Sequence, residues 1–165
     1  MDNRTFVFID RDGTMGGPYY VKYPTEAFRW LKENGYPAVI ITNQSCIARG
    51  LDGGCDFAAE FRDIGAYDWF ICPHDSHDHC RCRKSESGLF EQAVAKYDMD
   101  LIGDRWSDMA AAGKMGIKLV LVMTGRGEKA LGVDREKWSD YDPIFVAKDM
   151  LEAVRFIITN DSNSW

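Results

Sequence analysis

The chain has 165 residues, of which 45% are hydrophobic, and this is the size and composition of one ordinary domain with a buried core. A formal net charge of -6 and a sequence pI near 5.0 argue against a broad surface for nucleic acid or acidic lipid. No stretch approaches the roughly 20 apolar residues that span a bilayer. We therefore expect a cytoplasmic monomer, with a single domain over 1–165, a frayed tail at 160–165 and no nucleic-acid or membrane partner.

The N-terminal part of the chain alternates apolar runs with one helical segment. Residues 5–9 form a short apolar run that ends abruptly in the polar segment 10–14, which is typical of a buried strand with polar residues at its carboxyl end. Apolar residues recur at helical spacing over 25–34. A second buried strand is then predicted at 38–41.

The same alternation continues to the C-terminus. Strands are predicted at 68–71, 101–102, 118–123 and 144–146, and helices at 56–64, 89–97, 109–115 and 149–158. This order, with strands that are apolar on both faces, predicts a three-layer α/β/α domain with a mainly parallel sheet. No insertion is large enough for a cap domain. The connections near 50–69 and 100–101 are short, so either the protein is trimmed there or residues are missing from the sequence.

Polar residues follow several of the predicted strands. Ligands bind beyond the carboxyl ends of parallel strands, so one site is expected to collect Asp10, Asp12, Thr42, Asn43 and Asp104. Carboxylate oxygens are preferred ligands of Mg²⁺. One aspartate can attack phosphorus while a second carboxyl group protonates the leaving alcohol, which suits phosphoryl transfer.

Each of these motifs has an ordinary structural explanation when it is taken alone. Asp10 to Thr14 is compatible with a turn or a calcium loop, and Thr42-Asn43 with a turn or a helix cap. Lys84 is by default a solvated lysine. The combination of all four motifs favours a catalytic site.

In chain order, Asp10-Arg11-Asp12-Gly13-Thr14, Thr42-Asn43, Lys84 and Gly103-Asp104 with Asp108 resemble the four motifs of the haloacid dehalogenase superfamily. The resemblance covers most of the chain and implies a Rossmann-like core and a Mg²⁺-dependent phosphatase. It implies that Asp10 is the nucleophile and Asp12 the general acid and base. It also implies that Mg²⁺ is held by the carboxylates of Asp10 and Asp104 and by the backbone carbonyl of Asp12. Thr42, Asn43, Arg83 and Lys84 would bind the phosphate, and Asp108 would be a supporting residue or lie on a helix surface.

A cluster of thiols and imidazoles occupies the segment 72–84. Cys72, His74, Cys80 and Cys82 supply the closed Cys₃His set that suits structural Zn²⁺, with a reduced, metal-free loop as the alternative. The loop is too polar to bury a core, so zinc would order it and fix the direction of Arg83 and Lys84, which follow it directly. His77 and His79 are expected to be solvated, although either can substitute as a ligand.

This loop resembles the branch of the superfamily that contains heptose-bisphosphate and histidinol-phosphate phosphatases. The segment 42–50 is close to the heptose enzyme's, except that Cys46 replaces its usual glycine. The resemblance implies a small phosphorylated metabolite, with a heptose 1,7-bisphosphate losing its 7-phosphate ahead of histidinol phosphate. Glu86 disfavours a second phosphate nearby unless it points outward or pairs with Arg83.

Three further expectations concern how the site is used. The segment 16–20 and the zinc loop are expected to border the open site and narrow it to a small pocket. Tyr19 and Tyr20 are equally suited to core packing. A phosphotransferase or mutase with the same aspartyl phosphate is the alternative enzyme. A zinc-stabilised binding module without catalysis is the alternative outside enzymes.

Overall fold

Six parallel strands form the central sheet, in the order β3-β2-β1-β4-β5-β6. The computed structural model describes residues 5–18, 21–51, 53–95 and 99–161. The strands are β1 (Phe6–Ile9), β2 (Ala38–Asn43), β3 (Asp68–Cys72), β4 (Met99–Gly103), β5 (Lys118–Val122) and β6 (Phe145–Ala147). The chain runs from β1 through β2 to β3 on one side and from β4 through β5 to β6 on the other, so the strand order reverses between β1 and β4, which is where α/β sheets bind ligands.

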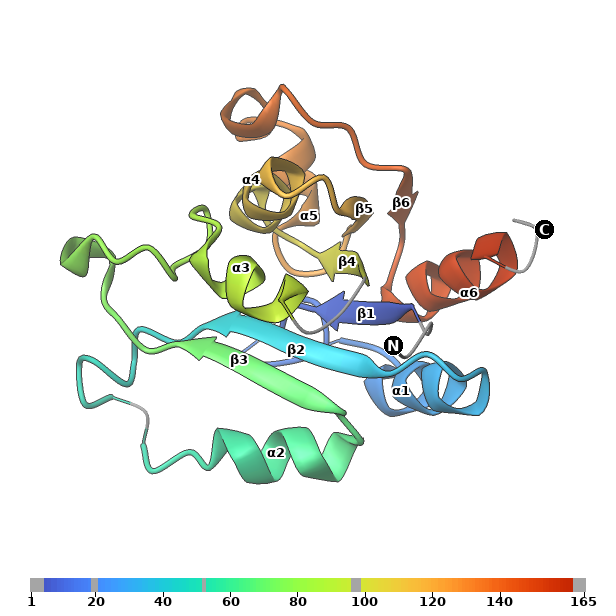
Figure 1. The fold of residues 1–165 in the computed structure, drawn as a ribbon, viewed down its shortest axis with the longest axis horizontal. Helices are drawn as coiled ribbons and strands as arrows, with labels where there is room; N and C mark the ends of the chain where they lie inside the picture. The colour runs from blue at the N-terminus through green and yellow to red at the C-terminus, as the bar shows by residue number, and fades with distance from the viewer. Residues whose placement is uncertain (1–4, 19–20, 52, 96–98, 162–165) are drawn as a thin grey trace.

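Helices cover both faces of the sheet, as Figure 1 shows. They are α1 (Pro24–Glu33), α2 (Phe57–Ile64), α3 (Gly88–Val94), α4 (Trp106–Lys114), α5 (Gly127–Leu131) and α6 (Met150–Asp161), with short 3₁₀ helices at Ser76–Asp78 and Arg135–Trp138. Successive side chains of β1 point to opposite faces. Phe6 and Phe8 pack in the core with α3 and α4, whereas Val7 and Ile9 pack with α1, α2 and α6. The predicted three-layer fold is therefore confirmed.

The predicted strands are all present, and the largest differences are at the start of β4 and the end of β2, each two residues from its predicted position. The predicted pair of residues at 101–102 is part of the five-residue strand β4, which gains its length by pairing with β1 and β5. Strand β2 continues through Thr42 and Asn43, which were expected after its end. Asn43 pairs with Cys72, so β2 and β3 end side by side.

The helix predictions are confirmed in part and corrected in part. The helix predicted at 56–64 is confirmed as α2, a regular helix of eight residues that is capped by the Asp56 side chain. Helix α5 and the 3₁₀ turn after it were not predicted. Asn160 and Asp161 were expected in a frayed tail but belong to α6, whereas 162–165 lie outside the described residues.

At the carboxyl edge of the sheet, the long connections 10–23, 44–56 and 73–87 follow β1, β2 and β3, whereas the connections after β4, β5 and β6 are short. No helix among the described residues is long and apolar enough to cross a membrane. No large cap domain interrupts the described chain between β1 and β3. Tyr19 and Tyr20, which were expected to wall the site or pack in the core, lie outside the described residues.

Candidate active site

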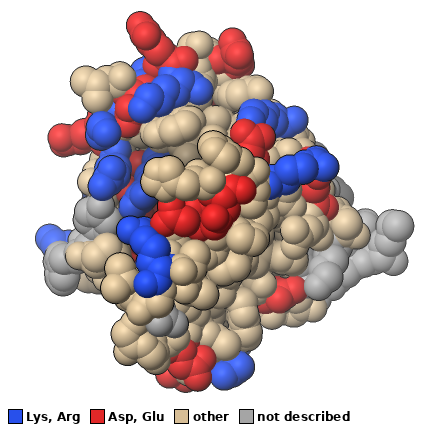
Figure 2. Space-filling view, turned by 90° about the vertical axis from the view of Figure 1, so that its left-hand side faces the viewer, with Lys and Arg blue, Asp and Glu red and all other residues tan. Residues whose placement is uncertain are grey.

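A cleft of about 950 Å³ opens beyond the carboxyl ends of the strands. It is bordered by the segment after β1, the Cys/His loop, the start of α4 and helix α5. Figure 2 shows acidic side chains gathered in the middle of one face, with lysine and arginine side chains on several sides of them. The residues that line the cleft are of both kinds, with Asp10, Asp12 and Asp108 beside lysine and arginine residues from several loops.

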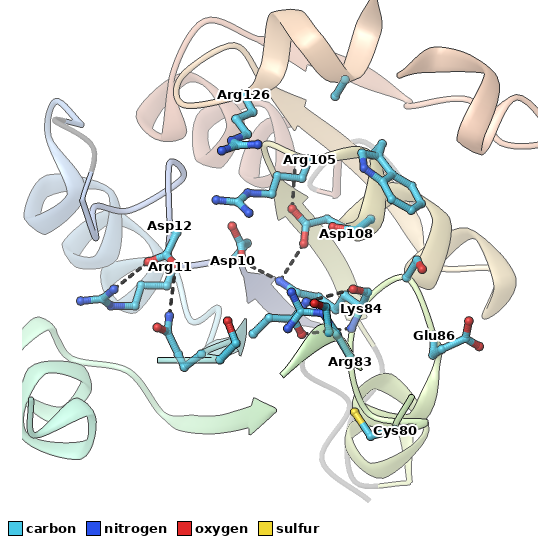
Figure 3. A pocket seen from close by; sticks show the side chains of 18 of the residues that line it. Asp10, Arg11, Asp12, Cys80, Arg83, Lys84, Glu86, Arg105, Asp108 and Arg126 are labelled. Atoms are coloured by element: carbon cyan, nitrogen blue, oxygen red, sulfur yellow. Dashed lines mark hydrogen bonds and ion pairs between the residues drawn. The ribbon is translucent and has the colours of Figure 1, made fainter. Parts of the chain in front are cut away.

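Lys84 joins two of the acidic side chains at the centre of this cleft. Its Nζ lies 2.5 Å from Asp10 Oδ1 and 2.6 Å from Asp108 Oδ1, and it also donates to the carbonyl oxygen of Ile41 at 2.9 Å. Asp10, Lys84 and Asp108 are all buried, and Figure 3 shows them pointing toward one another. Lys84 is therefore not a solvated lysine, and Asp108 does not lie on a helix surface.

Two local features bring Asp108 into the site. It is the third residue of α4, where its Oδ2 accepts a hydrogen bond from the backbone N–H of Arg105 at 3.1 Å. A Cβ at Gly103, the last residue of β4, would lie 2.8 Å from the Asp108 side chain. The absence of a side chain at Gly103 therefore leaves the room that Asp108 occupies.

Asp104 completes the acidic group and is packed between two glycines. A Cβ at Gly13 or at Gly125 would lie 2.2 Å or 2.3 Å from Asp104 Oδ2, and both glycines have positive φ angles. The same oxygen accepts a hydrogen bond from the backbone N–H of Arg126 at 2.8 Å. The other oxygen, Oδ1, is buried with no hydrogen-bond partner among the described residues.

These three carboxylates share more negative charge than the buried cation beside them can balance. Oxygens of Asp10, Asp104 and Asp108 lie within 4.8 Å of one another. Burial, followed by the charge of Asp108, raises the pKa of Asp10 to about 6, although Lys84 opposes this shift. Burial, followed by the charges of Asp10 and Asp108, raises the pKa of Asp104 to about 9. A divalent cation would relieve this repulsion, and Asp104 Oδ1, which lies 3.9 Å from Arg105 Nε and accepts no hydrogen bond from the described residues, fits as a ligand of such a cation.

Asp12 lies beside this group, and its carboxylate is not one of the three. Arg11 Nη1 donates to Asp12 Oδ1 at 2.6 Å, and Gln44 Nε2 donates to Asp12 Oδ2 at 3.2 Å. The predicted contact of Asp12 with the metal was through its backbone carbonyl, and it stays a prediction.

Asn43 lines the cleft and Thr42 is buried in the preceding position of β2, and the side-chain hydrogen bonds of both are made within the protein. The Asn43 side chain donates to the carbonyl oxygen of Lys84 at 2.9 Å and accepts from its backbone N–H at 3.0 Å. Thr42 is buried, and its Oγ1 accepts a hydrogen bond from Gln44 Nε2 at 2.9 Å. Asn43 thus holds the backbone of Lys84, a contact across 41 positions that the sequence did not indicate.

The four residues of the Cys/His set come together at one side of the cleft. Ligand atoms of Cys72, His74, Cys80 and Cys82 lie within 4.8 Å of one another, with neighbouring separations of 3.1 to 3.6 Å. Tetrahedral Zn²⁺ with Zn–S bonds of about 2.3 Å needs S···S edges of roughly 3.8 Å, so this arrangement is close to a zinc site. Burial raises the pKa of the Cys72 thiol to about 12, so a thiolate there needs a cation beside it.

The other polar residues of this loop lie outside the Cys₃His set. His77 and His79 are exposed and outside the four-residue set, and His77 Nδ1 lies 2.9 Å from Asp75. Arg83 lines the cleft and donates to the carbonyl oxygen of His74 at 3.3 Å. Glu86 does not pair with Arg83: Figure 3 shows it directed away from Asp10, and its carboxylate lies 3.7 Å from Lys114. Glu86 still borders the cleft, where Lys114 offsets part of its negative charge.

Comparison with known proteins agrees with this geometry. The HAD-hydrolase-like family model matches residues 81–153. The chain is 31% identical to a D-glycero-β-D-manno-heptose-1,7-bisphosphate 7-phosphatase of Haemophilus ducreyi, over 81% of this chain and 90% of the relative. It is 33% identical to the Bordetella bronchiseptica protein of the same name, over 76% of this chain and 84% of the relative.

A solved structure has the same fold. The crystal structure of D,D-heptose 1,7-bisphosphate phosphatase from B. bronchiseptica, complexed with magnesium and phosphate, superimposes with a TM-score of 0.80 at 25% identity. The match covers 94% of this chain and 99% of that one. The chain belongs to the haloacid dehalogenase-like hydrolases. Within that family, its similarity is to the heptose-bisphosphate phosphatases.

Proposed function

We propose that the protein is a Mg²⁺-dependent phosphomonoesterase that works through an aspartyl phosphate on Asp10. The observation that carries this proposal is the buried group of Asp10, Asp104 and Asp108 around a single lysine, in which Asp104 Oδ1 accepts no hydrogen bond from the described residues. Membership in the haloacid dehalogenase-like hydrolases supports it further. So does the Mg²⁺ and phosphate complex of the related B. bronchiseptica enzyme.

Asp10 would attack phosphorus in line with the leaving alcohol. Its Oδ1 accepts a short hydrogen bond from Lys84, and its Oδ2 accepts only a long one, of 3.5 Å, from Thr14 Oγ1, so Oδ2 is the less engaged oxygen and would be the attacking atom. The P–O bond to the alcohol breaks as the Asp10–phosphorus bond forms, and Asp12 gives a proton to the leaving oxygen. Water then attacks phosphorus, Asp12 takes its proton, and Asp10 is released with inorganic phosphate. Lys84 offsets charge on the phosphoryl oxygens throughout.

Two metals belong to this proposal. Asp10, Asp104 and the backbone carbonyl of Asp12 would hold Mg²⁺, with Asp108 supporting Lys84. When bound, Mg²⁺ supplies positive charge opposite the transferring phosphoryl group. Cys72, His74, Cys80 and Cys82 would hold a structural Zn²⁺ that orders the loop leading to Arg83 and Lys84.

The proposed substrate is D-glycero-D-manno-heptose 1,7-bisphosphate, which would lose its 7-phosphate. The names of the relatives support this choice. The cleft supports it as well, because eight cationic side chains line it: Arg11, Arg49, Arg81, Arg83, Lys84, Arg105, Arg126 and Lys129. Such a surround suits a ligand with more than one phosphate group. Histidinol phosphate is the second candidate, since the compact spacing from Cys80 to Cys82 resembles that branch.

The proposal also covers the cellular compartment, the domain organisation and the oligomeric state that the sequence predicts. All five cysteines are unpaired, which suits a reducing compartment such as the cytoplasm. One domain over residues 1–165 and a monomeric state stay predictions. A phosphotransferase or mutase differs only in the acceptor of the phosphoryl group, which an acceptor sugar in the assay distinguishes.

The test is phosphate release from a panel of phosphorylated metabolites, with and without Mg²⁺. Heptose 1,7-bisphosphate should give the highest kcat/KM, histidinol phosphate a lower one, and both should require Mg²⁺. Asp10→Asn should abolish release, by on the order of a thousandfold or more. Release that survives Asp10→Asn contradicts the mechanism. A non-catalytic module would release no phosphate from any member of the panel.

A further inference from the structure

The carboxylate of Asp12 is held by donors from two parts of the chain. Arg11 donates to its Oδ1, and Gln44 donates to its Oδ2. Gln44 is itself buried, and its Nε2 also contacts Thr42 Oγ1. Because both oxygens are engaged, the orientation of the carboxylate is set by these neighbours rather than by rotamer preference alone.

Arg11 is in turn fixed by helix α2. Its Nε and Nη2 donate to the two carboxylate oxygens of Glu60 at 2.8 and 2.9 Å, which makes a bidentate pair. The guanidinium carbon lies 5.1 Å from the centre of the Phe57 ring, one helical turn before Glu60. The pair uses two of the three guanidinium nitrogens, so Nη1 is the one that faces Asp12.

The contact between Arg11 and Asp12 is also closely packed. A Cβ at Gly17 would lie 2.2 Å from Asp12 Oδ1 and 3.1 Å from Arg11 Nη1. Arg11 and Asp12 are only 14% and 21% exposed at their side chains, respectively. Little room remains for the two groups to meet in another way.

We propose that Arg11 and Glu60 are positioning residues that aim Asp12 at the leaving oxygen of the substrate. The inference rests on the proposed role of Asp12 as general acid and base. Its basis is that an acid must lie within hydrogen-bond reach of the atom it protonates, and that a shift of about 1 Å costs on the order of a hundredfold in rate. Through Glu60, helix α2 contributes to the chemistry although it lies 49 positions from Arg11 in the chain.

The test compares two substrates that differ in their need for a general acid. The alkoxide of benzyl phosphate needs a proton as it leaves, whereas the 4-nitrophenolate of 4-nitrophenyl phosphate leaves without one. Glu60→Gln keeps the shape of the side chain and removes its charge. It should lower kcat/KM for benzyl phosphate about tenfold and for 4-nitrophenyl phosphate less than about twofold. Arg11→Lys, which loses the planar fork, should shift the ratio of the two in the same direction.

Two further variants make each outcome decisive. Asp12→Asn should change the same ratio more strongly, and Asp142→Asn, which breaks an exposed pair with Arg135, should leave it unchanged. An altered ratio in Asp12→Asn but not in Glu60→Gln refutes the positioning role and leaves the proposed function intact. An unaltered ratio in Asp12→Asn refutes the acid itself. An equal loss of kcat/KM on both substrates in Glu60→Gln would show that the Arg11–Glu60 pair has only a structural role.

Discussion

Asp104 is the residue whose ionisation should govern how stability depends on pH. In the folded protein its pKa is raised to about 9, mainly by burial, whereas in the unfolded chain it returns to its ordinary value of 3.8. Between these values the folded state binds more protons than the unfolded state, so the free energy of unfolding falls as pH rises. Asp10 adds the same trend up to a pKa of about 6. The Mg²⁺-free protein should therefore lose stability as pH rises from about 4 to about 9, most steeply below about 6, where both carboxyl groups contribute.

Thermal unfolding in zinc-replete, Mg²⁺-free buffer measures this slope. Saturating Mg²⁺ should flatten it, because the cation binds the carboxylate form. Asp104→Asn should also flatten it while lowering affinity for Mg²⁺, as read by calorimetry. If neither Mg²⁺ nor Asp104→Asn changes the dependence of stability on pH, the titrating group is not Asp104.

Lys84 should be the most important single cation for stability. Removing one partner of a buried ion pair leaves the other uncompensated, which costs about 3 kcal/mol. We expect Lys84→Met to lower the free energy of unfolding in urea by this amount without Mg²⁺, and by less with it. Lys114→Met is the matched control, since Lys114 is 41% exposed and should cost no more than about 0.5 kcal/mol. Equal losses in the two variants would contradict the buried role of Lys84.

The sequence predicted the residues of the site better than their contacts. Asp10, Asp104 and Lys84 were found because each follows an apolar run or a recognisable motif. The Asn43 contact with the Lys84 backbone and the Arg11 contact with Glu60 were not found. Both join segments more than 40 positions apart, and only the folded sheet brings such segments together.

At the scale of elements, the turns around Asp104 give the third prediction. Gly13 and Gly54 both have positive φ angles, so alanine at either should cost backbone energy, roughly 1 kcal/mol. A Cβ at Gly13 would also overlap Asp104 Oδ2, whereas nothing lies within 4 Å of a Cβ at Gly54. Gly13→Ala should therefore lose Mg²⁺-dependent phosphatase activity, by on the order of a hundredfold, and Gly54→Ala should keep it. Equal activities would show that the close contact with Asp104 is not needed.

The Cys/His loop gives the fourth prediction. Cys80→Ser should lower the zinc content and loosen the loop, so that Lys84 is placed less well and kcat falls. Cys55→Ser removes an exposed cysteine outside the set and is the control. Metal analysis together with Mg²⁺-dependent kinetics measures both effects. Full activity in a zinc-free Cys80→Ser protein would refute the positional role of the metal.

Elements were predictable where burial imposed a clear pattern. The strands β1, β2 and β5 are apolar on both faces and were located within two residues at each end. Helix α5 and the 3₁₀ turn at Arg135–Trp138 were missed because they are short and carry little apolar periodicity. Their order comes from tertiary contacts, such as the hydrogen bond from Trp138 Nε1 to the carbonyl oxygen of Ala130.

At the scale of the whole molecule, the proposal of one domain predicts a single unfolding transition. The two apolar clusters lie on opposite faces of one sheet and share its strands, so neither can unfold alone without exposing the other. Urea unfolding followed by far-ultraviolet circular dichroism and by tryptophan fluorescence should therefore give coincident curves. Separate midpoints would indicate two domains.

The parallel pairing of every strand also separates the two ends of the sheet. The turns that connect a helix to the next strand, such as those at Gly35 and Gly116, lie at the amino edge of the sheet, opposite the cleft. Nothing lies within 4 Å of a Cβ at either glycine. A short peptide tag or a fluorescent reporter inserted there should not obstruct the entry of substrate. This edge is therefore the place to attach the protein to a surface or a probe.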